Sequence, residues 1–269
     1  MNHAGTHHWA RHGALLGATL IAAGFAALLG GCKNNTSSAA TPERRVGKPP
    51  VVRPQFVQGP VRDADPVSSP VWRDAAWWAL TAPANTARTT APAQSAVLFD
   101  EGTLYVAVIN DLPPATDADS RDAVALFLDT KGEGRELLQV TADSSGQAQC
   151  AWIRTDAAIE PLADGSPNLG YPLDVRPNFP LAGLDVQVRH GVFEGRAVWT
   201  VVLAVPVAGM PGLMQVLPTK EARWKFNVLR MYMVGTGSRR EVMQANLSPV
   251  FVGAQAVSPY RLAELDFAR

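Results

Sequence analysis

The 269-residue sequence has few cysteines and no excess of charge. Cys32 and Cys150 are its two cysteines, which excludes a framework of several disulfides. The 24 basic residues balance the 24 acidic residues, and no cluster of lysine or arginine runs along the chain. A nucleic-acid partner would need such a positive surface, so we exclude that class of partner.

Motifs of common enzyme classes are also missing. The sequence contains no G-x-S-x-G, H-E-x-x-H or phosphate-binding loop motif, and His190 is the one histidine after residue 12. Few groups could therefore act as a base near neutral pH. A glycosidase with two carboxylates stays open, because its acids need no fixed spacing, but nothing selects a pair among 24 acids. We expect no enzyme.

The first 31 residues have the organisation of an export signal. A histidine-rich start precedes an apolar run of small residues, Ala14–Leu29, which is too short for a confident membrane-spanning helix. Leu29-Gly30-Gly31-Cys32 follows and resembles the bacterial lipobox. The resemblance implies cleavage before Cys32 and attachment of acyl chains such as palmitate to that residue. The alternative is an ordinary signal peptide with an incidental cysteine.

Residues 32–54 predict a lipidated cysteine followed by a flexible tether. The segment is polar, contains serine, threonine and proline, and cannot bury enough apolar surface to fold. Lys33, in place of an aspartate, resembles lipoproteins sent to the outer membrane of Gram-negative bacteria. We therefore expect a protein held on the membrane of the cell envelope through lipid.

Short β-branched and aromatic runs, separated by turn residues, predict one domain over residues 55–269. The strand candidates are Ser95–Phe99, Thr103–Ile109, Ala123–Leu128, Leu137–Thr141, Ala151–Ile153, Leu184–Arg189, Arg196–Val205, Arg223–Val234 and Tyr260–Ala268. No segment has a long 3.6-residue apolar period, so we expect an all-β, antiparallel, jelly-roll-like sandwich. Asp156–Leu181 contains five prolines and is expected to be one long irregular loop.

The order of landmarks along this domain resembles the family 9 carbohydrate-binding modules. The matching segments, between Val61 and Phe267, are GPVRDADPVSSPVWRDAAWWAL, VLFDEGTLYVAVINDL, RDAVALFLDTKGEGRELLQVTADSSG, WTVVLAVP, WKFNVLR and SPYRLAELDF. Each motif is weak alone, but their order and spacing together are specific. The resemblance implies a non-catalytic sandwich that binds a polysaccharide or envelope glycan at its loop end.

The sugar-clamping residues of that family match this sequence poorly. Family members place one tryptophan before the D-x-V strand and another before the last strand, whereas residues 119–121 and 254–258 contain no aromatic residue. Ala125 stands where the family strand carries a glutamate, and Gln139 and Thr141 are the polar positions of the next strand. A structural or protein-interaction lipoprotein of the envelope that has lost the sugar site is therefore the alternative function.

Other side chains could form a replacement surface for stacking and hydrogen bonding. The candidates are Arg121, Asp122, Gln139, Trp152 and Tyr171. A core position is the favoured interpretation of Trp152. The residues Trp72, Trp77, Trp78, Trp199 and Trp224 are interpreted as core or packing residues.

The sequence also contains residues for two candidate cofactor sites and a second cysteine. Asp117, Asp119 and Asp122 offer oxygen ligands for calcium, which relatives in the family bind, although the segment lacks the EF-hand glycine and glutamate and a solvated acidic loop is the alternative. A non-covalent haem is the minor alternative, with His190 and one of Met210, Met214, Met231, Met233 or Met243 as ligands. Cys150 is interpreted as buried and inert, with an intermolecular disulfide as the alternative.

Overall fold

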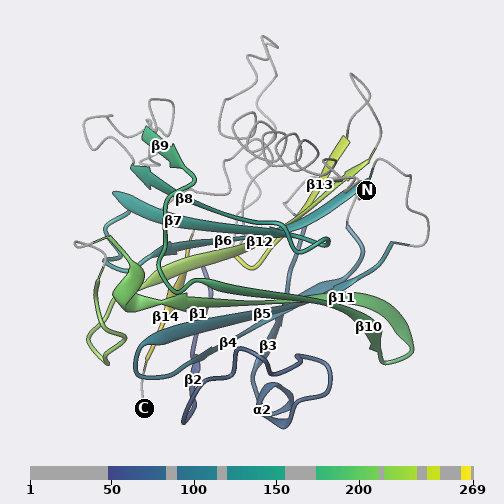
Figure 1. Ribbon diagram of the computed structural model, residues 1–269, viewed down its shortest axis with the longest axis horizontal. Coiled ribbons are helices and arrows are strands. Elements are labelled where there is room, and N and C mark those ends of the chain that lie inside the picture. The colour runs from purple at the N-terminus through teal and green to yellow at the C-terminus, as the bar shows by residue number, and fades with distance from the viewer. Residues whose placement is uncertain are drawn as a thin grey trace, which may run out of the picture. The chain divides into compact units, whose positions relative to one another are not determined.

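Two β-sheets, one above the other, form the domain (Figure 1). The structure is a computed structural model that describes residues 48–82, 90–113, 120–154, 174–211, 215–234, 241–248 and 262–267. The eight-stranded sheet has the order β1 (Val51–Val52), β14 (Ala263–Leu265), β12 (Lys225–Val234), β6 (Arg121–Asp129), β7 (Glu136–Asp143), β8 (Ala148–Arg154) and β9 (Asp174–Pro177), and β13 (Glu241–Asn246) pairs with β12. The six-stranded sheet has the order β10 (Asp185–Phe193), β11 (Arg196–Pro206), β5 (Thr103–Asp111), β4 (Ala93–Phe99) and β2 (Gln55–Phe56), and β3 (Trp77–Ala79) pairs with β4.

The predicted β-sandwich is confirmed, with one correction to its pairing. Most neighbouring strands are antiparallel, but β1 runs parallel to β14 and β2 runs parallel to β4. These two strands bring the start of the domain back onto both sheets, which are therefore mixed. No strand signal in the sequence marks β1, β2 or β13, because each is short or carries few β-branched residues.

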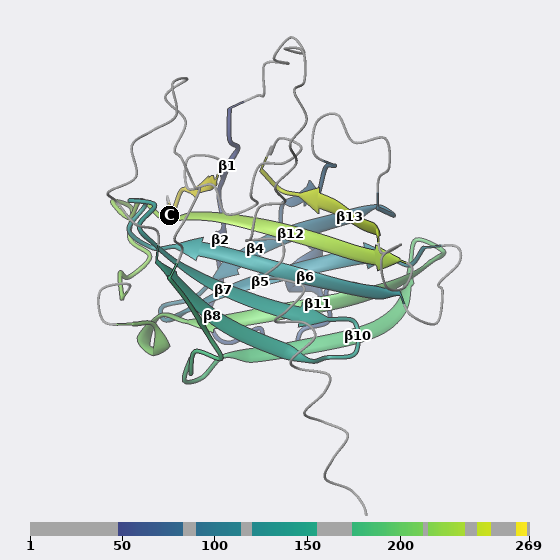
Figure 2. The same ribbon diagram turned by 90° about the horizontal axis from the view of Figure 1, so that it is seen from above.

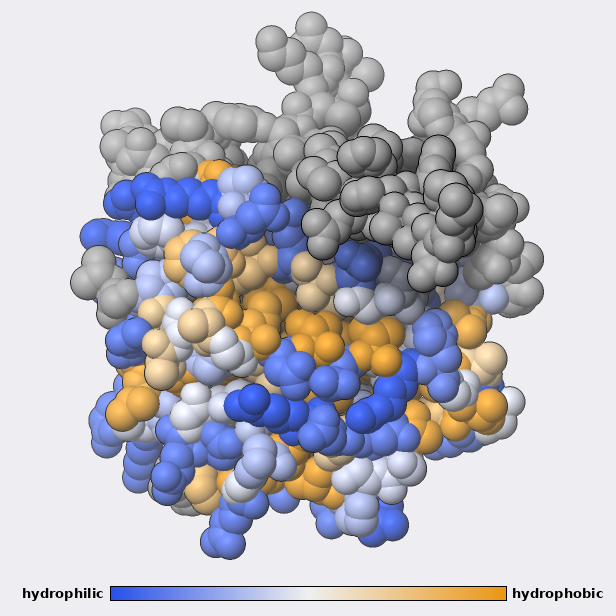
Figure 3. Space-filling view, in the orientation of Figure 1, coloured by the Kyte–Doolittle hydropathy of each residue, from blue (hydrophilic) through white to orange (hydrophobic). Residues whose placement is uncertain are grey.

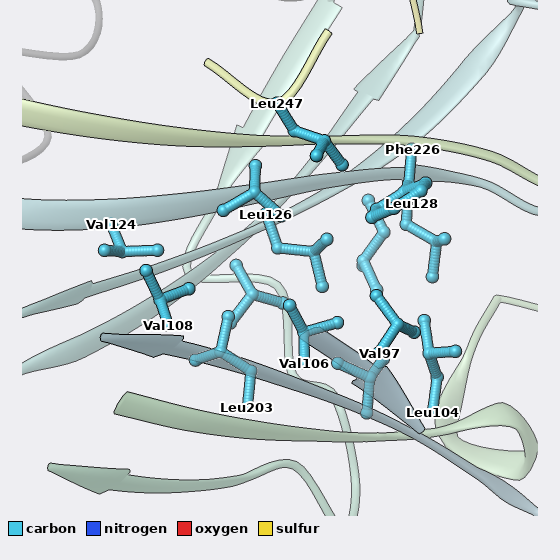
Figure 4. Close-up of a cluster of buried hydrophobic side chains, with 14 of the residues drawn as sticks. Val97, Leu104, Val106, Val108, Val124, Leu126, Leu128, Leu203, Phe226 and Leu247 are labelled. Atoms are coloured by element: carbon cyan, nitrogen blue, oxygen red, sulfur yellow. The ribbon is translucent and has the colours of Figure 1, made fainter. Parts of the chain in front are cut away.

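The core lies between the two sheets and is built from alternate residues of each strand. Figure 4 shows Val106 and Leu203 from the six-stranded sheet facing Leu126 and Phe226 from the eight-stranded sheet. Full burial of one such side chain contributes about 1.5–3 kcal/mol. The period of two that fills the core also sets which residues point to the outer faces.

A second apolar cluster covers the outer face of the six-stranded sheet. The chain between Val57 and Trp77, including the short helix α2 (Pro70–Arg73), packs on Leu98, Tyr105 and the residues around them. Trp72 is fully buried there, and its indole N–H donates to the carbonyl of Ala64 at 3.1 Å. The interpretation of the early tryptophans as packing residues is confirmed.

The prediction of one long irregular loop over Asp156–Leu181 is wrong for the second half of that segment. Residues 174–177 form β9, which pairs antiparallel with β8. The prolines misled the prediction because β9 lies at the edge of the sheet, where a proline is tolerated. Residues 155–173 lie outside the described residues, as do the predicted signal peptide, Cys32 and the tether up to residue 47.

No helix in the described part of the chain has the length and apolar character needed to cross a membrane. The described helices are α2 and the single 3-10 turn η1 (Val207–Gly209).

Candidate functional site

Amide and hydroxyl side chains gather on the outer face of the eight-stranded sheet. They are Gln139 and Thr141 of β7, Gln149 of β8, Asn227 of β12, and Gln244 and Asn246 of β13. Leu138, Val140 and Val228, which alternate with them, point into the core. The polar side chains therefore point away from it. We call these six residues, with the apolar side chains between them, the amide face.

The strand register arranges five of the six polar side chains of the amide face in two rows, and Gln244 lies opposite Met231 in a third row. One row is Asn227, Phe127, Gln139 and Ala151, and the next is Asn246, Leu229, Ala125, Thr141 and Gln149. Side chains directly opposite each other in such rows have Cβ atoms about 4.5–5.5 Å apart. Figure 2 looks onto this side of the sheet and shows β12, β6, β7 and β8 in that order. Hydrogen-bonding groups thus alternate with apolar ones in the first row, and they flank two apolar residues in the second.

Four polar side chains of the amide face are at most 5% exposed, namely Gln139, Thr141, Asn227 and Asn246. The Gln139 Nε2 donates to Thr141 Oγ1 at 3.1 Å, and Asn227 Oδ1 accepts from the Ser248 amide at 3.0 Å. The side-chain amide of Asn246 has no hydrogen-bond partner among the described residues. A buried polar group without a partner costs about 1–3 kcal/mol. Asn246 is therefore a donor and an acceptor that a ligand could satisfy.

Asp122 is not on the amide face, which corrects its assignment as a sugar or calcium ligand. Its carboxylate points between the sheets, where Arg230 donates to Oδ1 at 3.0 Å and to Oδ2 at 2.5 Å. The indole N–H of Trp199 also donates to Oδ2, at 2.7 Å. Both oxygens are thus used inside the protein. Asp122 holds the two sheets together and has no free face for a ligand.

Arg121 and Gln139 are the described candidates that share the outer face, but the structure does not bring them together. Gln139 is paired with Phe127, which is six residues from Arg121 along β6. Six strand residues span about 20 Å. Tyr171 lies outside the described residues. The five predicted sugar-binding candidates therefore do not form one site.

Trp152 lies on the other side of the sheet from Gln139, half-buried against the core, as its favoured interpretation predicted. Its ring contacts Phe179, with centroids 6.0 Å apart, and the guanidinium of Arg176 lies 4.8 Å from the ring centroid. Arg154 lies 5.9 Å from the same centroid. A cation over the ring occupies the surface that a sugar would need for stacking. Trp152 is a packing residue in this structure.

Neither predicted cofactor site is formed by the described residues. Asp117 and Asp119 lie outside them, and no group of three or more acidic, histidine or cysteine side chains in the described part could hold a metal. His190 is on β10 of the six-stranded sheet, whereas Met231 and Met233 are on the outer face of the other sheet. Met210 is buried in the core, Met243 is on β13, and Met214 is outside the described residues. The structure therefore does not bring His190 together with Met231 or Met233.

Cys150 is buried in the core, as predicted. Burial raises the pKa of its thiol to about 12. A thiol with such a pKa carries almost no thiolate at neutral pH and is inert.

Comparison with known proteins places this geometry on a recognised fold. No protein-family model and no curated protein matches the sequence. A candidate carbohydrate-binding protein from Bacteroides uniformis is similar in structure, with a TM-score of 0.53 and 10% identity, over 82% of this chain and 100% of its own. Two structures of a family 9 carbohydrate-binding module from Caldicellulosiruptor kristjanssonii, in complex with cellotriose and with glucose, have TM-scores of 0.49 at 14% and 15% identity. They cover 80% and 81% of this chain and 93% and 95% of that module. The domain is similar in fold to the Bacteroides uniformis protein.

At these identities the likeness concerns the fold of the domain and not its sugar contacts. Three buried polar residues were missed from the sequence, namely Asn227, Arg230 and Asn246. For Arg230 a signal was present, because an arginine in the apolar run NVLRMYM must find a partner when the strand is buried. Asn227 carries a weaker form of the same signal. Nothing in the sequence marks Asn246.

Proposed function

We propose that this protein is a non-catalytic, lipid-anchored glycan-binding lipoprotein, and that the amide face is its sugar site. The observation that carries the proposal is the difference between the two outer faces. The chain's own residues 57–77 seal the outer face of the six-stranded sheet with apolar contacts. The outer face of the eight-stranded sheet keeps six amide or hydroxyl side chains instead.

The chemistry of the amide face suits the hydroxyl groups of a sugar. A carboxamide both donates and accepts hydrogen bonds, and so does each sugar hydroxyl. Phe127, Leu229 and Met231 lie between the amides and supply apolar surface for the C–H faces of a sugar ring. A few polar groups on an apolar surface are typical of small-molecule sites. The likeness in fold to a candidate carbohydrate-binding protein supports the same conclusion.

Burial of Gln139 and Asn246 means that sugar binding must include a rearrangement that uncovers the amide face. This burial is also the observation that favours the second candidate function, a structural or protein-interaction lipoprotein of the envelope. The two functions differ in one measurable property. The first predicts saturable binding of a soluble oligosaccharide by the isolated protein, and the second predicts none.

The anchor and location rest on the sequence around Cys32. We propose that the protein is attached to the cell envelope, at the outer membrane of a Gram-negative bacterium, through acyl chains on Cys32. Cells grown with radioactive or alkyne-labelled palmitate test this directly. The chain should incorporate label and sediment with membranes, and Cys32→Ser should abolish both. Equal labelling of the Cys32→Ser chain would overturn the proposed anchor.

A further inference from the structure

The strand β10 forms one edge of the six-stranded sheet, and the described part of the chain pairs no strand with its free side. Figure 2 shows β10 at one side of the molecule, beside β11. The strand is nine residues long, whereas edge strands are usually kept short or are blocked. A long free edge is a template for pairing with another chain. We call the free side of this strand the β10 edge.

The hairpin that joins β10 to β11 determines which main-chain groups lie on the β10 edge. Its two turn residues, Glu194 and Gly195, have φ values of +49° and +77°, as in a type I′ turn. Phe193 and Arg196 flank this turn as a pair. The flanking pair of such a hairpin exchanges both of its hydrogen bonds, and bonded and non-bonded pairs then alternate along the ladder. The odd-numbered residues of β10 therefore bond to β11, and the even-numbered residues point their N–H and C=O groups toward the free edge.

A hydrogen bond on the far side of β11 confirms this pattern. Ala197 is opposite Val192 in the ladder, and its carbonyl oxygen accepts from the Leu112 amide at 2.9 Å, away from β10. Val192 is therefore in a non-bonded pair, and so are the residues at every second position before it. The main-chain groups of Val186 and Val188 thus lie on the β10 edge, where no described residue is their hydrogen-bond partner. They are available to an added strand.

The sequence of β10 is self-complementary about Gln187. In an antiparallel second copy centred on this residue, Asp185 is opposite the second copy's Arg189, and Val186 is opposite the second copy's Val188. The two-fold symmetry repeats both pairs. Val186 and Val188 carry the free main-chain groups, so they form the hydrogen-bonded pairs. Asp185 and Arg189 then form the non-hydrogen-bonded pairs, in which the side chains are closer together.

Asp185 and Arg189 are available for these ion pairs. Asp185 accepts from the side-chain amide of Gln187 at 3.1 Å, and Arg189 donates through Nη2 to the carbonyl oxygen of Asp63 at 2.9 Å. Neither contact neutralises a charge, and neither side chain has a partner of opposite charge among the residues that the structure describes. The Nη1 of Arg189 also lacks an acceptor there. Opposite charges directly across a ladder stabilise the pairing of two strands.

The inward-facing side chains next to the β10 edge are apolar. Leu184, Val186 and Val188 contact the core and are half-buried. Figure 3 looks onto this side of the molecule, where apolar side chains lie between the two sheets. In the antiparallel register each of the two valines lies beside the other valine of the second copy. Pairing therefore removes apolar surface of both copies from water.

We propose that two copies of this protein associate through their β10 edges, antiparallel and centred on Gln187, so that their six-stranded sheets become one continuous sheet. A second copy is the partner whose charges match by symmetry, because each copy uses the same residues. The two-fold axis is perpendicular to the continuous sheet, so both amide faces lie on the same side of the dimer. Two such faces favour a long or surface-bound polysaccharide through avidity. This consequence rests on the proposed function, whereas the association uses no residue of the amide face.

Cysteine crosslinking tests the register in the full chain carrying Cys32→Ser, in which the other native thiol, Cys150, is buried. Gln187→Cys places two thiols opposite each other in a non-hydrogen-bonded pair, within reach of a disulfide. Mild oxidation should give a disulfide-linked dimer. Val192→Cys is the matched control, because Val192 is 64% exposed on the same strand but about ten residues from its own copy in this register, beyond the ~7 Å reach of a disulfide. A Gln187→Cys chain that stays unlinked, or equal linkage of both variants, would overturn the proposal.

Reversal of the charges tests the ion pairs by sedimentation velocity. The parent chain should show a monomer–dimer equilibrium, and Arg189→Asp should weaken it at least about tenfold, because two like-charge pairs replace two attractive ones. The double variant Asp185→Arg with Arg189→Asp restores opposite charges and should return to within about threefold of the parent. Arg135→Asp is the control, because it makes the same change of charge at an exposed turn residue, and it should associate like the parent.

Two results of the sedimentation experiment would contradict the proposed dimer. A double variant that associates as weakly as Arg189→Asp would show that Asp185 and Arg189 do not meet across the β10 edge. A parent chain that stays monomeric at every concentration would exclude the second copy as the partner and would leave the β10 edge to a strand of a different protein.

Discussion

Arg230 and Asp122 form an ion pair inside the sandwich. The Arg230 side chain is fully buried, and it donates to both oxygens of Asp122 and to the carbonyls of Ala91, Pro92 and Asp111. Asp122 is on β6, whereas the three carbonyl groups belong to β5 and to the residues before β4. One guanidinium therefore links the two sheets at this end of the domain.

Loss of one member of this pair should destabilise the domain strongly. Asp122→Asn leaves the buried Arg230 without a countercharge, which costs about 3–5 kcal/mol. Urea unfolding measures this loss. Arg121→Gln is the control, because Arg121 is the exposed neighbour of Asp122, and it should change the unfolding free energy by less than about 0.5 kcal/mol. The double variant Asp122→Leu with Arg230→Met should recover much of the stability, and equal losses in the single and double variants would contradict the assigned role.

The turn between β6 and β7 depends on Gly132. Gly132 has a φ of +70°, and a Cβ there would lie 2.2 Å from the carbonyl oxygen of Arg223. Gly146 also has a positive φ, +87°, but open space around it. Gly146→Ala should cost about 1 kcal/mol for the left-handed backbone, and Gly132→Ala about 3 kcal/mol because overpacking adds to that cost. Thermal unfolding of both variants checks this, and equal losses would show that the Arg223 contact is unimportant.

The sequence predicts most strands here but not the face on which a side chain lies. In β6 nearly all residues are buried, so the run AVALFL has no alternation of polar and apolar residues to show that Asp122 points inward. Gln139 and Trp152 lie on opposite faces because the turn pairs Gln139 with Ala151. A register shift of one residue would reverse that result. The candidate residues were therefore of suitable types, but the sequence could not group them.

The buried thiol of Cys150 makes stability depend on alkaline pH. Its pKa is raised from 9.0 to about 12 because burial disfavours the thiolate. The unfolded chain thus loses the proton first as pH rises. The stabilising contribution is complete below about pH 9 and is lost as pH rises toward 12, by up to about 4 kcal/mol.

Urea unfolding of the parent chain and of Cys150→Ala at several pH values isolates this effect. Tyrosines and lysines titrate alike in both proteins, so their contributions cancel. The parent should lose its stability advantage between pH 9 and 12. A difference that stays constant with pH would show that the thiol is not buried in solution.

Trp152 should affect stability and not sugar binding. Trp152→Ala removes a half-buried side chain that contacts Phe179 and the core, and we expect a loss of about 2 kcal/mol, below the range for a fully buried tryptophan. Oligosaccharide affinity should stay within about twofold of the parent. Loss of sugar binding at unchanged stability would instead make Trp152 a stacking platform.

The central claim is that the amide face binds a glycan. Isothermal titration of the full chain carrying Cys32→Ser against xylan, cellulose and peptidoglycan fragments, with and without calcium, tests it most directly. We expect saturable heat with at least one glycan, weakened about tenfold or more in Gln139→Ala, because a lost hydrogen bond in a buried site costs about 1–3 kcal/mol. The control Gln147→Ala changes an exposed glutamine in the adjacent turn and should bind like the parent. No heat with any glycan, or equal affinities in Gln139→Ala and Gln147→Ala, would contradict the claim.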